Sequence, residues 1–182
     1  MGPANRGEAG QRDNGLVGMG VLIRPAEDDD WPGVWPLWHA VVAAGETYPY
    51  DPETTSEEGR AMWFAAPPAF TWVAVTPDGQ FVGTYQLTPN QRKLGDHVAN
   101  ASFMVAPEAR GMGVGRQLGV HCLDAARALG YRAMQFNAVV TTNIASLQLW
   151  RSLGFIIVGT VPRGFRHAVR GEVDMHIMHR FL

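Results

Sequence analysis

A cluster of glycines between a β-rich segment and an amphipathic helix constrains the fold more than any other feature of this sequence. Gly111, Gly113 and Gly115 fall within five residues. Glycine at this density costs conformational entropy, so we expect it only where the backbone must approach another group closely. From residue 114 the apolar residues recur at steps of three and four, which predicts a helix that Gly130 ends.

The start of this helix is suited to binding an anion. Backbone N–H groups in the first turn of a helix have no intrahelical acceptor, and they carry the positive end of the helix dipole. The amides of residues 111 to 116 are therefore predicted to form an anion cradle, to which Arg110 and Arg116 add charge and bidentate donors. A pyrophosphate group fits such a cradle.

Two common phosphate-binding loops match this segment poorly. A Walker A loop needs Gly-Lys followed by Ser or Thr, whereas the chain has Gly115-Arg116-Gln117. A dinucleotide-binding fingerprint follows an early strand of a parallel βαβ unit, whereas this segment follows a run of predicted antiparallel strands. Neither class of nucleotide-binding protein is therefore indicated.

The periodicity of the remaining chain predicts one mixed α/β domain. A short β-rich run at residues 21–23 precedes three others that predict consecutive antiparallel strands, and a strand–helix–strand–helix–strand pattern with a terminal strand follows. The fold class is thus α/β (α+β), a mixed and mostly antiparallel sheet flanked by helices. The later predicted strands are 70–75, 80–87, 98–105, 131–140, 155–161 and 172–179.

The first part of the chain divides into a tail and two helices. Residues 1–18 are rich in glycine and polar residues and have no apolar period, which predicts a flexible tail and leaves 19–182 as the domain. A helix is expected from about residue 28 to residue 44, with a kink or break at Pro36. A second is expected over 56–65.

Charge and cysteine content exclude several functions. Lys and Arg number 15 against 17 Asp and Glu, a formal net charge of -2, and no run of like charges offers a surface for nucleic acid or an anionic membrane. The single cysteine, Cys122, permits neither an intramolecular disulfide nor a cysteine-rich zinc site, and the histidines lack ligand spacing. No apolar segment has the length of a signal peptide or membrane span, so we expect a cytoplasmic protein without nucleic-acid, membrane or metal partners.

Two motifs together resemble the GNAT superfamily of N-acetyltransferases. Arg110, Gly113 and Gly115 match the family's Arg/Gln-x-x-Gly-x-Gly/Ala motif. Downstream, the run from Asn143 through Ser146 to Gly154-Phe155 looks like the helix and strand entry that line the pantetheine and phosphate arm in that family. The resemblance covers residues 19–182, and it implies the GNAT fold with acetyl-CoA as co-substrate.

The resemblance also implies where acetyl-CoA binds. A β-bulge between Asn100 and Val105 is expected to open a gap, in which backbone N–H groups near Met104 and Val105 hold the pantetheine and polarise the thioester. Combined with the anion cradle, the expected cofactor-binding residues are Met104, Val105, Arg110, Gly111, Met112, Gly113, Val114, Gly115, Arg116, Asn143 and Ser146.

A closer likeness points to the acceptor side. Several short segments resemble the fungal L-azetidine-2-carboxylate (proline-analogue) N-acetyltransferases, in which an asparagine on each of two splayed strands contacts the acceptor amine. The matching residues are Asn100 and Asn137, both in otherwise apolar runs where a buried amide needs a partner. A structural role, bonded to a bulge carbonyl or a water, is the alternative. The resembling segments are 45–49, 98–101, 136–143 and 161–162.

A group must donate a proton to the departing thiolate, and the sequence offers several candidates for it. Many GNAT members place a tyrosine where this chain has Trp150, and an indole cannot donate that proton at neutral pH. Tyr48, Tyr50 and Tyr85 are candidates, with core or rim packing as the plain alternative. Glu46 could act as a base through water. We assign Glu46 and Tyr48, with Asn100 and Asn137, to the acceptor site.

These features predict an enzyme that transfers an acetyl group from acetyl-CoA to the amine of a small molecule, with an amino acid or proline-like compound as candidates. A protein or peptide acceptor would favour an open groove between the Glu46 loop and residues 161–171, whereas a capped pocket favours a small molecule. A non-catalytic acyl-CoA sensor is the third alternative. The exposed aromatic residues and terminal strands are also compatible with a homodimer.

Overall fold

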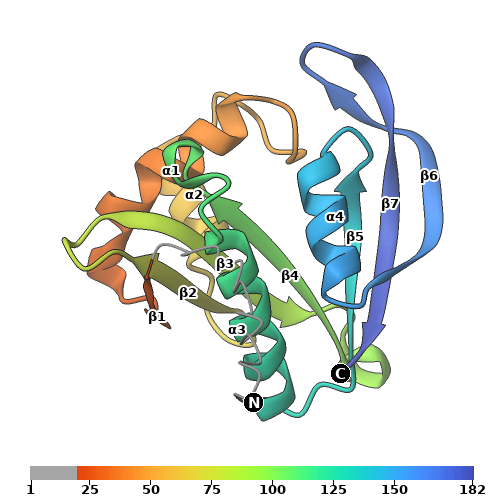
Figure 1. Cartoon of the computed structure of the whole chain (residues 1–182), viewed down its shortest axis with the longest axis horizontal. Helices are drawn as coiled ribbons and strands as arrows, with labels where there is room; N and C mark the ends of the chain where they lie inside the picture. Colours follow the sequence, from red (N-terminus) through yellow and green to blue (C-terminus); the bar gives the residue numbers. More distant parts are fainter. Residues whose placement is uncertain (1–19) are drawn as a thin grey trace, which may run out of the picture.

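The computed structural model describes residues 20–182 and contains one seven-stranded sheet (Figure 1). The predicted tail over residues 1–18 lies outside the described residues. Neighbouring strands follow the order β1-β2-β3-β4-β5-β7-β6, and only the β4–β5 pair is parallel. The expected mixed, mostly antiparallel fold is therefore confirmed. The strands are β1 (Leu22–Pro25), β2 (Phe70–Val75), β3 (Phe81–Pro89), β4 (Val98–Val105), β5 (Ala133–Val140), β6 (Ile156–His167) and β7 (Gly171–Phe181).

Helices cover both faces of this sheet. Thr84 of β3 accepts a hydrogen bond from the indole of Trp63, whereas its neighbour Tyr85 bonds to His121 on the opposite face. The second and third helices therefore lie on opposite sides, and Figure 1 shows the fourth helix over β5. None of the helices within residues 20–182 is long and apolar enough to cross a bilayer. The helices are α1 (Trp31–Ala43), α2 (Ser56–Trp63), α3 (Val114–Ala128) and α4 (Ile144–Ser152), with short 3₁₀ turns at Asp28–Asp30, Lys93–Gly95 and Pro107–Ala109.

Local signals set the ends of these helices. At the start of α2 the Thr55 hydroxyl accepts the Glu58 N–H, and the Glu58 carboxylate accepts the Thr55 N–H, which forms a capping box. Gly130 follows α3 with a φ of 85°, a conformation that favours glycine. The end of α3 was thus readable from the sequence.

Helix α1 is continuous from Trp31 to Ala43, so of the kink or break predicted at Pro36 the break does not occur. Proline cannot donate to the carbonyl four residues earlier, which here belongs to Pro32 in the first turn. Because this missing hydrogen bond lies so close to the start of the helix, the other backbone hydrogen bonds of the helix are largely undisturbed. The helix buries several side chains along its length, including Trp38 and Val42, which are fully buried, and this packing offsets the lost bond.

Strands β4 and β5 separate soon after they begin. They pair in parallel at two positions, the second of which joins Ala99 to Met134. The pairing of β4 with β3 runs without a shift over residues 99–105. The β-bulge expected between Asn100 and Val105 is therefore absent, because the gap forms where β5 leaves β4 and not where β4 bends away from β3.

Strands β6 and β7 form a long hairpin that extends past the end of β5 (Figure 1). The sequence predicted a strand that ends at Val161, but β6 continues to His167. Pro162 cannot donate to a strand ladder, and the register shifts between Val161 and Phe165. The chain thus accommodates Pro162 in an irregularity of the ladder, and the strand resumes beyond it.

An ion pair joins the first strand to the start of α1. The Arg24 guanidinium donates to both carboxylate oxygens of Asp30, at 2.6 and 2.7 Å, and the Glu27 N–H donates to the same carboxylate at 2.8 Å. Asp30 is 7% exposed. The hydrogen bonds from Arg24 lower the pKa of Asp30 below its usual value, in spite of the opposing effect of burial.

Asp30→Asn is expected to lower the free energy of unfolding by about 2 kcal/mol at neutral pH, because Arg24 loses a charged, bidentate acceptor. Since the folded-state pKa of Asp30 is lowered, its contribution is present above the pKa of an unfolded Asp and is lost as pH falls through the folded-state pKa. Urea denaturation at about pH 7 and about pH 3 measures both effects, and the two proteins should differ less at the lower pH.

Asp28→Asn is the matched control, because Asp28 forms an exposed ion pair with Arg60. We expect it to change the free energy of unfolding by less than about 0.5 kcal/mol. An equal loss in the two variants would contradict the special role of Asp30.

Candidate functional site

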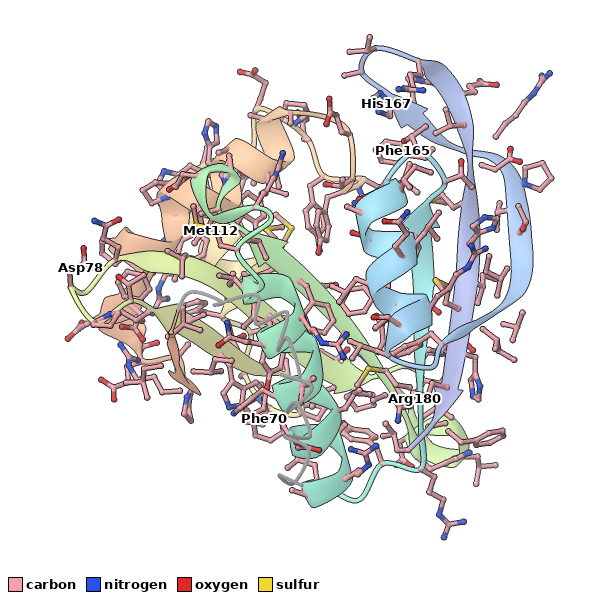
Figure 2. All side chains as sticks on the ribbon, in the orientation of Figure 1. Phe70, Asp78, Met112, Phe165, His167 and Arg180 are labelled. Atoms are coloured by element: carbon pink, nitrogen blue, oxygen red, sulfur yellow. The ribbon has the colours of Figure 1, made fainter. Side chains whose placement is uncertain are left out.

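A cleft of about 1140 Å³ occupies the gap between β4 and β5. Its walls come from the loop after α1, the open edge of β4, the glycine-rich loop before α3, the C-terminal half of β5 and the length of α4. Of the residues that the sequence assigned to the site, all but Met112 line this cleft. Met112 is 44% exposed and lies on the side of the glycine loop away from α4 (Figure 2).

The glycine-rich loop presents backbone amides to the cleft. Gly111 and Gly113 have φ angles of 77° and 79°, which favour glycine. The N–H groups of Gly111, Gly113, Val114 and Gly115 have no acceptor among the described residues. The amides of residues 112 and 116 instead donate within turns, at 3.3 and 3.1 Å. The cradle predicted from residues 111 to 116 therefore consists of four amides.

Two arginines flank these amides. Arg110 is exposed and lines the cleft beside Gly111. Arg116 also lines the cleft, and one of its guanidinium nitrogens donates to the Ser152 hydroxyl at 3.0 Å, which ties α3 to α4. Their charges add to the positive end of the α3 dipole, so this wall attracts an anion.

The start of α4 forms the facing wall. The Asn143 side chain accepts the N–H of Ser146 at 3.2 Å and caps the helix. Trp150 is 7% exposed and packs against Phe103 and Phe136, with ring centroids 4.7 Å apart in each case. Trp150 thus serves as packing between β4, β5 and α4, where many family members have a tyrosine.

The open edge of β4 carries backbone groups that β5 does not pair. The Tyr48 hydroxyl donates to the Phe103 carbonyl at 2.8 Å and accepts the Phe103 N–H at 2.9 Å. Because backbone groups alternate between the two edges of an antiparallel strand, Val105 also presents its N–H to the open edge. Met104, in register with Thr84, presents its N–H to β3 instead.

The two asparagines lie on neighbouring strands. Asn100 has the same strand parity as Met104 and faces the side of α2, whereas Phe103 faces α4. Asn100 is half-buried and Asn137 is exposed, so neither is the buried amide that the apolar runs suggested. Asn137 accepts a bond from Gln135 at 2.8 Å and donates to Asn90 at 2.7 Å.

The structure separates the three candidate tyrosines. Tyr85 is fully buried on the α3 face, where its hydroxyl bonds to His121 at 2.7 Å, and it does not line the cleft. The hydroxyl proton of Tyr48 is already donated to Phe103. Tyr50 lines the cleft, and its hydroxyl bonds to no other described residue. Burial raises the pKa of Tyr50 above its usual value.

A backbone hydrogen bond joins the loop after α1 to the tip of the β6–β7 hairpin beside the cleft. The N–H of Ala168, at the tip of the β6–β7 hairpin, donates to the carbonyl of Gly45 at 2.9 Å. Glu46 and His167, the neighbours of these two residues, both line the cleft. His167 was not assigned from the sequence, because its place depends on how far the hairpin extends beyond β5.

The cleft fits the co-substrate that the family resemblance implies. Four free amides and two arginines match a pyrophosphate, and the edge of β4 at Val105 offers an N–H along the path of an extended arm. An added Cβ at Gly111 would meet nothing within 4 Å, so the space beside its backbone is open to a ligand. Within residues 20–182, no group of three His, Cys, Asp or Glu side chains could hold a metal ion.

Comparison with known proteins identifies a family. A profile of the Acetyltransferase (GNAT) family matches residues 35–155. The chain is 29% identical over 151 residues to N-acetyltransferase aca1 of Schizosaccharomyces pombe, which covers 75% of this chain and 72% of that protein. It is also 29% identical over 147 residues to L-amino acid N-acyltransferase MnaT of Escherichia coli, covering 79% and 84% of the two chains.

A solved structure shares the whole arrangement. A GCN5-related N-acetyltransferase from Kribbella flavida superposes with a TM-score of 0.85 and is 50% identical, over 89% of this chain and 98% of that chain. The open sheet and the flanking helices are therefore common to both molecules.

Gly111→Ala is expected to weaken coenzyme A binding about 10-fold, because a methyl group at this φ strains the loop and stands in the cradle. Isothermal titration calorimetry measures the dissociation constant. Gly130→Ala is the matched control: Gly130 has a similar φ of 85° and equally open space, but lies at the other end of α3. Equal weakening in both variants, or in neither, would contradict a ligand-binding role for the Gly111 backbone.

Proposed function

Because the chain belongs to the GNAT family of acetyltransferases, we propose that it acetylates the amine of a small molecule such as an amino acid. Membership of the family makes the protein an N-acetyltransferase with acetyl-CoA as co-substrate. The proposal that the acceptor is a small molecule is based on the hydrogen bond between Ala168 and Gly45. This bond joins the two segments between which a polypeptide would have to pass, and such a bridge favours a small-molecule acceptor.

The residues at the two ends of the cleft belong to opposite faces of the sheet. The anion cradle belongs to the α3 face, whereas Asn100 points to the α2 face, as strand alternation from Phe103 requires. An acceptor can therefore reach the thioester from the side opposite to the phosphates. The name of MnaT, an L-amino acid N-acyltransferase, supports an amino acid as the acceptor.

The transfer forms one C–N bond and breaks one C–S bond, so the amine must lose a proton and the sulfur must gain one. Acetyl-CoA, when bound, supplies the activated acyl group. We assign the Val105 N–H to polarising the thioester carbonyl, and Asn100 and Asn137 to holding the acceptor amine. Glu46, the carboxylate of the lining, takes the amine proton through water.

Tyr50 is the proposed donor of the proton to the departing sulfur. It is the candidate tyrosine that lines the cleft and keeps its hydroxyl unbonded by the other described residues. Because burial raises its pKa, the hydroxyl stays protonated throughout the neutral range. Its ring stacks on Tyr48 and Trp38, with centroids 5.5 and 5.7 Å apart, which holds the side chain in place.

Release of the coenzyme A thiol with a panel of amino acids, cyclic imino acids, polyamines, aminoglycosides and short peptides tests the proposal. We expect turnover above hydrolysis with a free amino or imino acid. Asn137→Ala should lower kcat/KM for that acceptor about 10-fold or more without changing the affinity for acetyl-CoA. Turnover with peptides alone would favour a peptide acceptor, and tight binding without any turnover would favour a sensor domain.

Tyr50→Phe is expected to lower kcat about 100-fold, because the stacked ring is kept while the proton donor is removed. Steady-state thiol release and calorimetry with coenzyme A measure kcat and binding separately, and binding should not change. Tyr131→Phe, a half-buried tyrosine outside the cleft lining, is the control. An unchanged kcat in Tyr50→Phe would mean that water delivers the proton.

A further inference from the structure

His167 lies at the acceptor end of the cleft without a role in the assignments above. It is the last residue of β6, next to Ala168, whose N–H donates to the Gly45 carbonyl. Figure 2 shows it near the tip of the hairpin, with Phe165 between it and α4. His167 is 7% exposed, and it is one of the residues that line the cleft.

The contacts of His167 fix which ring nitrogen carries the proton. Its Nδ1 accepts the N–H of Val169 at 3.1 Å, so Nδ1 is unprotonated and Nε2 bears the hydrogen. The Phe165 ring packs perpendicular to the imidazole, with centroids 6.3 Å apart. No hydrogen bond or ion pair from residues 20–182 engages Nε2. Among residues 20–182, the buried side-chain donor without a partner is the Trp38 indole, so Nε2 of His167 is not sealed in the core and can donate to a ligand in the cleft.

The charges around the cleft indicate which ligand group Nε2 would meet. The cationic side chains of the lining are Arg110 and Arg116, and both belong to the wall of the anion cradle. At the acceptor end, Glu46 offers a carboxylate to an ammonium group, while the hydrogen-bond donors include His167, the asparagine amides and the Tyr50 hydroxyl. An acceptor with one positive and one negative group would complement both.

We propose that His167 determines acceptor specificity by donating its Nε2–H to a carboxylate oxygen of the acceptor. The inference rests on the proposed small-molecule function and makes its substrate class narrower: amines that carry a carboxylate, such as α-amino and imino acids, in preference to the corresponding amides or simple amines. His167 thereby acts as a specificity-determining residue that takes no part in proton transfer.

Two substitutions distinguish recognition of the acceptor carboxylate by His167 from its structural role at the hairpin tip, where it accepts the Val169 N–H. His167→Asn keeps an acceptor near the position of Nδ1 for the Val169 N–H but removes the distal donor. His167→Gln places an amide donor near the position of Nε2 but loses the Nδ1 acceptor. Arg166→Ala, at an exposed neighbour outside the cleft lining, controls for general disturbance of the hairpin.

The experiment measures kcat/KM by thiol release with matched pairs of acceptors, an amino acid and its amide, together with the dissociation constant of coenzyme A. Wild type and Arg166→Ala should prefer the acid. In His167→Asn the acid is expected to lose about 10- to 100-fold in kcat/KM, mainly through KM, so that the preference disappears. His167→Gln should keep most of the preference for the acid. The dissociation constant of coenzyme A should be the same in all variants.

Each other outcome has a distinct meaning. Equal turnover of acid and amide by wild type, or an equal loss for both acceptors in His167→Asn, would overturn the role of His167 and leave the proposed function standing. Wild type that turns over no small amine would overturn the proposed function, and this inference with it.

Discussion

The parting of β4 from β5 is the constraint on which the rest of the site depends. Two parallel strands in the middle of a sheet normally satisfy each other's backbone groups, and here they do so at two positions before they separate. The exposed edge is partly satisfied by the Tyr48 hydroxyl, which takes the place of a strand partner at Phe103. The remaining edge is left free to hold an extended ligand in the manner of an added strand.

The same separation gives the cleft two ends of different chemistry. A wall made of amides and arginines at the start of α3 suits phosphate oxygens, and it contributes mostly backbone groups. The opposite end is built from side chains, among them Asn100 and Asn137, whose chemistry can differ while the fold stays the same. In the proposed function, cofactor binding thus depends mainly on the backbone of the fold, and acceptor binding on individual side chains.

This division also explains what the sequence could predict. Glycine spacing and residue periodicity are local signals, so α3, α4 and most strand positions were readable in advance, whereas the extension of β6 beyond Pro162 was not. Which amides of the cradle are free depends on turn bonds of Met112 and Arg116, which no pattern indicated. The roles of the tyrosines and of His167 depend on contacts between residues far apart in the chain, such as Tyr48 with Phe103.

The bond between Gly45 and Ala168 joins two main-chain atoms. This link beside one end of the cleft therefore does not depend on which side chains stand next to it. Gly45 itself is constrained, because its φ is 61° and an added Cβ would lie 3.0 Å from that of Ala168. During divergence of this chain, the side chains that line this end of the cleft could thus be exchanged to accept new amines. The hydrogen bond between Gly45 and Ala168 would persist, provided that position 45 remained glycine.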